Sequence, residues 1–250
     1  MSLARRFFAK GSYHTHCPWP WWVALIDSVL LYFTAGFAAV VVSLALPQWS
    51  YYYLFPNLAN HDYPIAFYVV GWCVWTFAAP WLLVAWLNRR GCLLDVLPLG
   101  PGSLGTGKTA LLVIGAASLY VSLSALAATI YPDKTYKDAA YFIYYMHSPV
   151  APLMLLMGVV GAPVMEEMMF RGFLQTALSS TRLGFWGASA ILSAVWSLLH
   201  RYSWSGTAVV FSSGLVFSLL LWKTGSLRAG MVAHGLINLV GMMWIAFAYQ

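Results

Sequence analysis

The stretch PVAPLMLLMGVVGAPVMEEMMFRGFLQTAL, residues 149–178, decides the fold, because it is apolar over a membrane-spanning length yet contains three ionisable side chains. Residues 151–165 hold no ionisable group, and Glu166, Glu167 and Arg171 then follow close together. Charged residues make up only 8% of the chain, so this concentration is unusual. An ionised carboxylate in hydrocarbon costs about 3 kcal/mol on membrane-insertion scales and usually faces a wet cavity. The stretch therefore indicates a membrane helix that carries a functional site.

The composition is that of an integral membrane protein. The 250 residues are 61% hydrophobic, well above the share in soluble domains, and their mean hydropathy is +0.74. A chain of this length holds about seven helices of about 20 residues and leaves no room for a second, soluble domain. We therefore expect an all-α, polytopic membrane protein that forms a single membrane domain (1–250) with a buried polar catalytic cavity. Spans are predicted near 20–46, 63–88, 109–130, 149–178, 183–200, 206–222 and 228–248.

The lysines and arginines predict the orientation and the compartment. With the N-terminus in the cytoplasm, nine of those in loops are cytoplasmic and three, Lys134, Lys137 and Arg201, are not. The first apolar run has the length of a span, so no cleavable signal peptide is expected. Together with short loops, this predicts a prokaryotic cytoplasmic (inner) membrane. The net charge of +6 is scattered along loops, so no nucleic-acid partner is expected.

One motif match points to a different function. Residues 102–109, GSLGTGKT, fit the phosphate-binding pattern GxxxxGK[ST]. That pattern binds phosphates between a buried strand and a helix whose N-terminus faces the ligand. Here Pro98 and Pro101 precede the match and a predicted membrane span follows it. We interpret Gly102–Thr109 as a glycine-rich loop and do not expect ATP to bind.

The two adjacent glutamates cannot serve the same partner. In a helix Glu166 and Glu167 point about 100° apart. Glu167 and Arg171 are four residues apart, on one face and within reach of an ion pair, which would offset the burial of both charges. Glu166 is then the unpaired carboxylate, free to act on water.

Two later spans add polar groups to the apolar sequence. His200 ends one span, and His234 and Asn238, four residues apart, share one face of the last. A single membrane histidine is more often a hydrogen-bonded packing residue than a catalyst. Three separate segments with Glu, His and His/Asn together favour a catalytic site.

These motifs resemble those of the CPBP family of intramembrane proteases, which includes type II CAAX prenyl endopeptidases, bacteriocin-processing proteins and Abi-type immunity proteins. The resemblance covers about residues 149–239 and rests on EExxxR at Glu166–Arg171, aromatic-xxx-His at Trp196–His200 and HxxxN at His234–Asn238. The chain departs from the family at Trp196, where Phe is usual. The resemblance implies a catalytic core at residues 149–248. Residues 1–148 form an N-terminal three-helix region without family motifs.

The resemblance implies hydrolysis of a peptide bond in or beside the membrane by glutamate-activated water. Glu166 would be the general base, with His200 helping to hold or polarise the water. His234 and Asn238 would donate hydrogen bonds to the oxyanion that develops on the scissile carbonyl. The expected substrate is a membrane-associated protein or peptide, such as a leader, a C-terminal sorting tail or a CAAX-like substrate.

Two other functions remain open. The same polar groups could relay protons or ions in a transporter, or the chain could be an inert scaffold or immunity protein of protease ancestry. In the protease that the resemblance implies, Glu167 and Arg171 have a supporting role and hold their helix in shape. Sequence favours the enzyme because the groups needed for attack by water occur together.

No cofactor is expected for the preferred mechanism. The alternative is zinc, with Glu166, His200 and His234 as the ligands. Zinc proteases commonly carry HExxH on one helix, and this chain does not. A glutamic-type mechanism is therefore preferred to a zinc metalloprotease.

The depths of the site residues disagree if all helices are straight. At about 1.5 Å per residue, Glu166 and His200 lie about 20 Å and about 26 Å from the turn near Ser180. His234 lies only about 10 Å from its own loop at the same end. Helix tilt, a break near Pro163 or a short, partly re-entrant sixth segment would close this gap.

Overall fold

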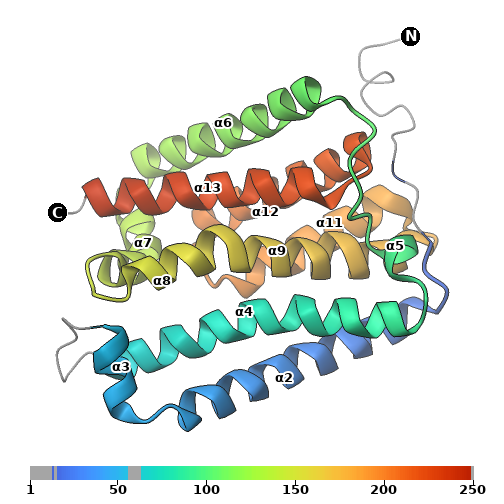
Figure 1. Cartoon of the computed structure of the whole chain (residues 1–250). Coiled ribbons are helices and arrows are strands. Elements are labelled where there is room, and N and C mark those ends of the chain that lie inside the picture. Colours follow the sequence, from blue (N-terminus) through green and yellow to red (C-terminus); the bar gives the residue numbers. More distant parts are fainter. Residues whose placement is uncertain (1–12, 14–15, 56–62, 249–250) are drawn as a thin grey trace.

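The structure, a computed structural model, describes residue 13, residues 16–55 and residues 63–248. Within these residues every regular element is helical. The long helices lie side by side and alternate in direction, so that α2 begins at one end of the bundle and α13 finishes at the other (Figure 1). The helices are α2 (Trp21–Ala45), α3 (Gln48–Leu54), α4 (Tyr63–Arg89), α5 (Leu93–Val96), α6 (Thr106–Ile130), α7 (Pro132–Met146), α8 (Ala151–Leu156), η2 (Met157–Gly161), α9 (Ala162–Glu166), η3 (Glu167–Leu174), α10 (Gln175–Ser179), α11 (Gly184–Leu199), α12 (Trp204–Thr224) and α13 (Leu227–Ala248).

All seven segments predicted to span the membrane are helical, and their ends lie within a few residues of the predicted ones. Six are long and apolar enough to cross a bilayer, namely α2, α4, α6, the continuous stretch Ala151–Ser179, α12 and α13. The seventh, α11, has 16 residues and reaches about 24 Å at the α-helical rise. The prediction of an all-α, polytopic membrane protein is thus confirmed.

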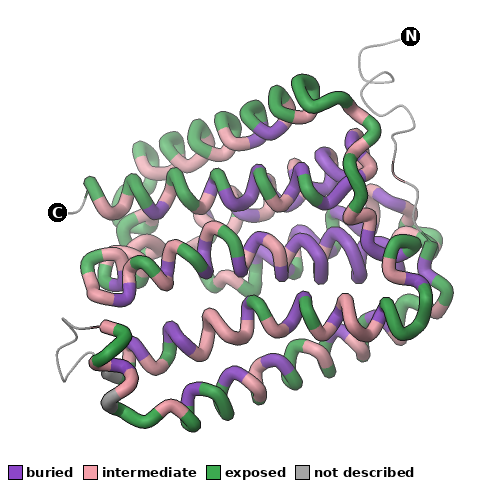
Figure 2. The backbone as a smooth tube through the Cα atoms, viewed as in Figure 1, coloured by how far each residue is buried: buried purple, intermediate pink, exposed green. Residues whose placement is uncertain are grey.

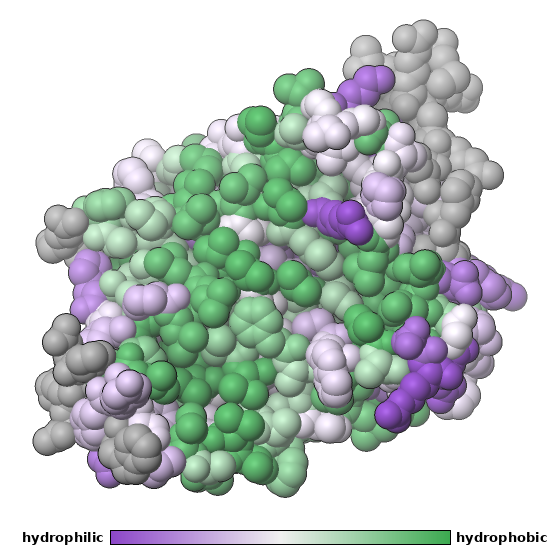
Figure 3. All heavy atoms as spheres, in the orientation of Figure 1, coloured by the Kyte–Doolittle hydropathy of each residue, from purple (hydrophilic) through white to green (hydrophobic). Residues whose placement is uncertain are grey.

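Apolar side chains cover the outside of this bundle. The outward faces of α2 and α6 are exposed, whereas buried residues concentrate in the central stretch Ala151–Ser179 and the helices around it (Figure 2). Phe37 on α2 and Leu111 on α6 are each 72% exposed. Hydrophobic groups dominate the middle of the visible face, and hydrophilic groups gather mainly towards the helix ends (Figure 3). Such a surface is stable only in lipid, so the chain is an integral membrane protein.

Small side chains let the first two spans pack closely. The buried residues of α2 are all alanine or serine, and α2 packs along α4. In a membrane, where lipid is as apolar as leucine, small residues favour helix association by allowing the backbones to approach. These residues are Ala24, Ser28, Ala35, Ala39 and Ser43.

The outer loop expected after the third span is instead an amphipathic helix, α7 (Pro132–Met146), which packs against α6, α12 and α13. Its Asp138 accepts hydrogen bonds from the backbone N–H (2.7 Å) and hydroxyl (2.6 Å) of Ser203, the N-cap residue of α12. Asp138 therefore fixes the start of α12. The charged residues of α7 explain why a search for apolar spans does not find this helix.

The central stretch Ala151–Ser179 stays helical throughout but contains two π-helical segments, η2 and η3, on either side of Pro163. A π turn holds more residues than an α turn, so it brings Glu166 nearer to the α10 end than α-helical geometry predicts. The helix does not break at Pro163, and α12 has a full spanning length rather than being a short re-entrant segment. Of the two π segments, η3 is the one between Glu166 and α10, so it shortens that part of the helix.

Residues 102–109 do not follow a strand. The chain before α6 is irregular, and α6 itself is a candidate membrane span. Within the loop, the backbone N–H of Ser103 donates to the carbonyl oxygen of Thr224 at 2.8 Å. The match to the phosphate-binding pattern therefore comprises a loop, residues 102–105, attached to the end of α12, and the first turn of α6.

Candidate active site

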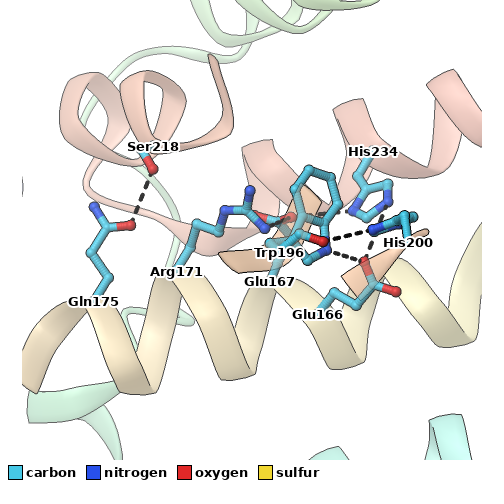
Figure 4. A network of polar contacts seen from close by, with 8 residues as sticks. All are labelled: Glu166, Glu167, Arg171, Gln175, Trp196, His200, Ser218 and His234. Atoms are coloured by element: carbon cyan, nitrogen blue, oxygen red, sulfur yellow. Dashed lines mark hydrogen bonds and ion pairs between the residues drawn. The ribbon is translucent and has the colours of Figure 1, made fainter. Parts of the chain in front are cut away.

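The two glutamates occupy the junction between α9 and η3 in the middle of the central stretch. Glu167 is buried (1% exposed) and its Oε1 accepts from Arg171 Nη1 at 3.3 Å and from His234 Nδ1 at 3.2 Å. The predicted ion pair between Glu167 and Arg171 is thus present, and a histidine from α13 joins it (Figure 4). A Cβ atom at Gly230 would lie 3.0 Å from Glu167 Oε2, so glycine there leaves space for the carboxylate.

Arg171 is buried between two aromatic rings. Its guanidinium carbon lies 4.2 Å from the centroid of Trp196 and 5.5 Å from that of Phe217. The guanidinium thus meets a carboxylate on one side and ring faces on the other, the surroundings that tolerate a buried arginine best. This arrangement balances the charge of Glu167 without using Glu166.

Glu166 has a different environment. Its side chain is 17% exposed, and its Oε2 accepts a 2.6 Å hydrogen bond from the indole Nε1 of Trp196. The same oxygen lies 4.0 Å from His234 Nε2. Both contacts end on one carboxylate oxygen, while the other points away from them (Figure 4). The partly exposed carboxylate is therefore oriented and keeps a free oxygen.

His234 lies between the two glutamates. One ring nitrogen contacts Glu167 and the other faces Glu166, and the imidazole stacks on Phe217 with centroids 5.0 Å apart and planes 21° apart. With Nδ1 bonded to Glu167, the position of Nε2 is fixed beside Glu166. A hydrogen-bonded second nitrogen is the usual way in which proteins orient a functional histidine.

His200 reaches the site through Trp196. Its Nδ1 lies 2.8 Å from the backbone oxygen of Trp196, and the two rings are 4.9 Å apart. The ring of Trp196 also lies 5.5 Å from that of His234, so one indole contacts both histidines. Tyr202, in the loop after α11, lies 5.5 Å from the ring of His200. Burial raises the pKa of Tyr202, with Tyr120 and Glu166 adding to the effect, so the phenol stays neutral.

Asn238 points to a different part of the central stretch. Its amide nitrogen donates to the backbone oxygen of Gly158 in η2 at 2.7 Å. His234 and Asn238 thus both contact the central stretch that carries the glutamates. His234 contacts Glu167, whereas Asn238, one turn further along α13, contacts Gly158. In the structure Asn238 braces η2, and its second amide hydrogen is not used in that bond.

The zinc alternative finds no ready-made ligand set in the described part of the chain. There, no three His, Cys, Asp or Glu side chains lie close enough together to hold a metal ion. Glu166 and His234 approach each other, and the Nδ1 of His200 contacts the backbone, which leaves its Nε2 as the nitrogen that could ligate a metal. Glu166, His200 and His234 would therefore have to move to bind zinc with its usual ligand distances of about 2 Å.

From the sequence, Trp196 was only the aromatic residue of the motif that ends at His200, with no role of its own. The structure gives it a direct bond to Glu166, and the signal for this in the sequence was an indole N–H, which needs an acceptor, among apolar residues. Phe217 was not identified at all, because nothing in an apolar helix distinguishes the one phenylalanine that stacks on a histidine.

Comparison with known proteins yields one match. Residues 148–240 match the family described as Type II CAAX prenyl endopeptidase Rce1-like. Neither the curated proteins nor the solved structures gave a match to the chain. The matched range contains the glutamates, the ion pair, Trp196 and both histidines. Residues 148–240 of this chain are therefore a domain of the Rce1-like type II CAAX prenyl endopeptidase (CPBP) family, which implies a CAAX-type intramembrane protease.

Proposed function

We propose that the protein is an intramembrane endopeptidase of the glutamic type, in which Glu166 activates water against a peptide bond of a membrane-associated substrate. The observation that carries the proposal is the contrast between two adjacent carboxylates. Glu167 is buried and paired with Arg171, whereas Glu166 is 17% exposed and has no arginine partner in the described structure. Only Glu166 combines an oriented carboxylate with access from outside the protein.

The proposed reaction needs one base and one donor. The water oxygen bonds to the scissile carbonyl carbon, its proton passes to Glu166, and the carbonyl electrons move to the oxygen. His234 Nε2, in its protonated form, then stabilises this oxyanion. The C–N bond breaks as Glu166 returns the proton to the leaving nitrogen. His200, beside Trp196, helps to hold the water.

The charges favour a donor at His234. Glu166 and Glu167 contribute two negative charges, and Arg171 contributes one positive charge close to Glu167. The ring of His234 lies between the two glutamates, and the attraction of a donated hydrogen to negative charge is strong where water is scarce. The second hydrogen of the Asn238 amide is available to a substrate carbonyl that enters beside η2.

We further propose an orientation with the start of α2 on the cytoplasmic side of a prokaryotic inner membrane. Arg89, Arg90, Lys108, Arg182 and Lys223 all lie in loops or helix ends at that side. This excess is what the positive-inside rule requires. The substrate then meets the site within or next to the bilayer.

The test compares the wild-type protein with Glu166→Gln and with Asp133→Asn, a matched loss of charge at an exposed position of α7. Purified proteins are given an internally quenched, farnesylated peptide that ends in a CAAX motif, and membrane peptides from cells that express each variant are compared by mass spectrometry. We expect Glu166→Gln to lower cleavage about 100- to 10,000-fold and Asp133→Asn to leave it unchanged. Full activity of Glu166→Gln would show that Glu166 is not the general base.

Two further outcomes decide between the alternatives. Activity that survives a chelator, and that added zinc does not increase, supports the metal-free mechanism; loss with a chelator and recovery with zinc would replace it by a metalloprotease. A cellular effect that persists in Glu166→Gln, without any cleaved product, would identify a scaffold. Ion or solute flux without cleavage would identify a transporter.

A further inference from the structure

Trp196 is the common neighbour of Glu166, Arg171 and both histidines of the site. Its ring is 3% exposed and lies under the Arg171 guanidinium at 4.2 Å, beside His200 at 4.9 Å and beside His234 at 5.5 Å. Its single polar atom, Nε1, donates to Glu166 Oε2 at 2.6 Å. No other hydrogen bond from a side chain to Glu166 is found in the described part of the chain, so the indole decides how this carboxylate is oriented.

The contact is short for an N–H donor. Hydrogen bonds to a charged oxygen are shorter and about twice as strong as neutral ones. The arginine over the ring face draws electron density from the indole, which makes its N–H a better donor. A buried indole N–H also needs an acceptor, and burial of Trp196 leaves the carboxylate of Glu166 in that role.

The geometry distinguishes the two oxygens of Glu166. Oε2 receives Trp196 and faces His234, whereas the other oxygen, Oε1, points away from both (Figure 4). A carboxylate held at one oxygen cannot turn its plane freely, so the direction of its free lone pairs is set. General-base catalysis depends on such alignment, because a misplacement of 1 Å costs about 100-fold in rate.

We propose that Trp196 is a positioning residue for the glutamate base: its N–H occupies Oε2 and leaves Oε1 to take the proton from water. The inference rests on the proposed role of Glu166 and adds to it a specific oxygen and the residue that selects it. Phe at this position would keep an aromatic ring but has no such donor. In this chain the orientation of the base therefore depends on the indole.

The first test needs no substrate. Protein labelled with ¹⁵N-tryptophan gives up to 13 indole N–H resonances, and Trp196→Phe identifies the one from Trp196 by its loss. We expect this resonance to lie downfield of the others and to move upfield in Glu166→Gln, because a neutral amide oxygen is a weaker acceptor than a carboxylate. If Trp196→Phe folds poorly, Glu166→Gln alone suffices, since one resonance should move far more than the rest. A spectrum that Glu166→Gln leaves unchanged overturns the proposal.

The second test is kinetic. With the quenched farnesylated CAAX peptide, Trp196→Phe should lower kcat about 10- to 100-fold while KM stays within about twofold, because the variant disturbs the base and not substrate binding. Trp186→Phe, on the same helix but packed against Phe185 and Trp222, is the control and should keep both constants.

The outcomes separate the two proposals. If Trp196→Phe keeps the wild-type kcat and Glu166→Gln is inactive, the positioning role of Trp196 is wrong, whereas Glu166 remains the proposed base. Activity in Glu166→Gln overturns the base and the positioning role with it. A fall in kcat that follows a fall in Tm, with no change of the indole resonance in Glu166→Gln, makes Trp196 a packing residue only.

Discussion

Asn238 donates its side-chain amide to the backbone oxygen of Gly158 across 2.7 Å, and this bond joins the last span to the first π segment. At the end of η2 the backbone N–H of Ala162 donates to Met157, five residues earlier. In the same register the next residue, Pro163, would donate to Gly158, but proline has no N–H. Asn238 thus supplies the donor that Pro163 lacks.

Replacement of Asn238 by leucine should destabilise the protein by about 1–3 kcal/mol, because the carbonyl of Gly158 would lose its partner in a water-poor place. In a Pro163→Ala background the cost should be clearly smaller, since an alanine in place of the proline restores a backbone donor. Unfolding of the four proteins in detergent measures this coupling. Equal costs of Asn238→Leu in both backgrounds would show that the proline does not create the need.

The buried pair of Glu167 and Arg171 predicts non-additive stability. Glu167→Gln or Arg171→Met alone leaves a buried charge uncompensated and should cost about 3–5 kcal/mol. The double replacement should cost less than the sum of the two, because no lone charge remains. Arg182→Met, at an exposed position, is the control and should change the unfolding free energy little. Additive losses would show that the two residues act separately.

Cys17 and Cys92, in the segments before α2 and before α5, should resist alkylation. Burial raises the pKa of both thiols, so at pH 8 less thiolate, the reactive form, is present than for a free cysteine. Iodoacetamide should label them at least about 10-fold more slowly in detergent than after unfolding in SDS. The rate should rise with pH only above the usual range for cysteine. Fast labelling of the native protein at pH 8 would contradict the burial of these residues.

The proposed orientation predicts how reporters behave at the two ends of the bundle. Alkaline phosphatase fused after Gln250 should be active and a fluorescent protein there dark, because seven spans that begin inside end outside. A reporter pair fused after Arg90, just beyond the end of α4, should behave in the opposite way. The reverse pattern at both sites would invert the orientation without changing the fold.

Much of the architecture was accessible from local sequence. The apolar runs predicted the bounds of seven helices to within a few residues, because the length of an apolar run can be read from neighbouring residues. The ion pair between Glu167 and Arg171 followed from their spacing of four, which places them together in any helix. α7 was missed for the same reason, since four charged residues in its first half do not resemble a span.

The site was only partly predictable. Glu166, His200 and His234 were identified because ionisable residues are unusual in apolar segments. Their distances from the membrane surface, calculated for straight α-helices, did not agree. The π segment η3 changes the backbone register between Glu166 and α10, and a change of backbone hydrogen-bond register leaves little trace in side-chain periodicity.

The sequence by itself therefore determined that this is a helical membrane protein with a buried ion pair and a nearby unpaired carboxylate, because composition and i,i+4 spacing act locally. Only the tertiary structure decided that His234 lies between the glutamates, that Asn238 braces Gly158 and that Trp196 holds one oxygen of Glu166. Those contacts join residues 30 to 80 positions apart, and their geometry depends on how whole helices pack against one another.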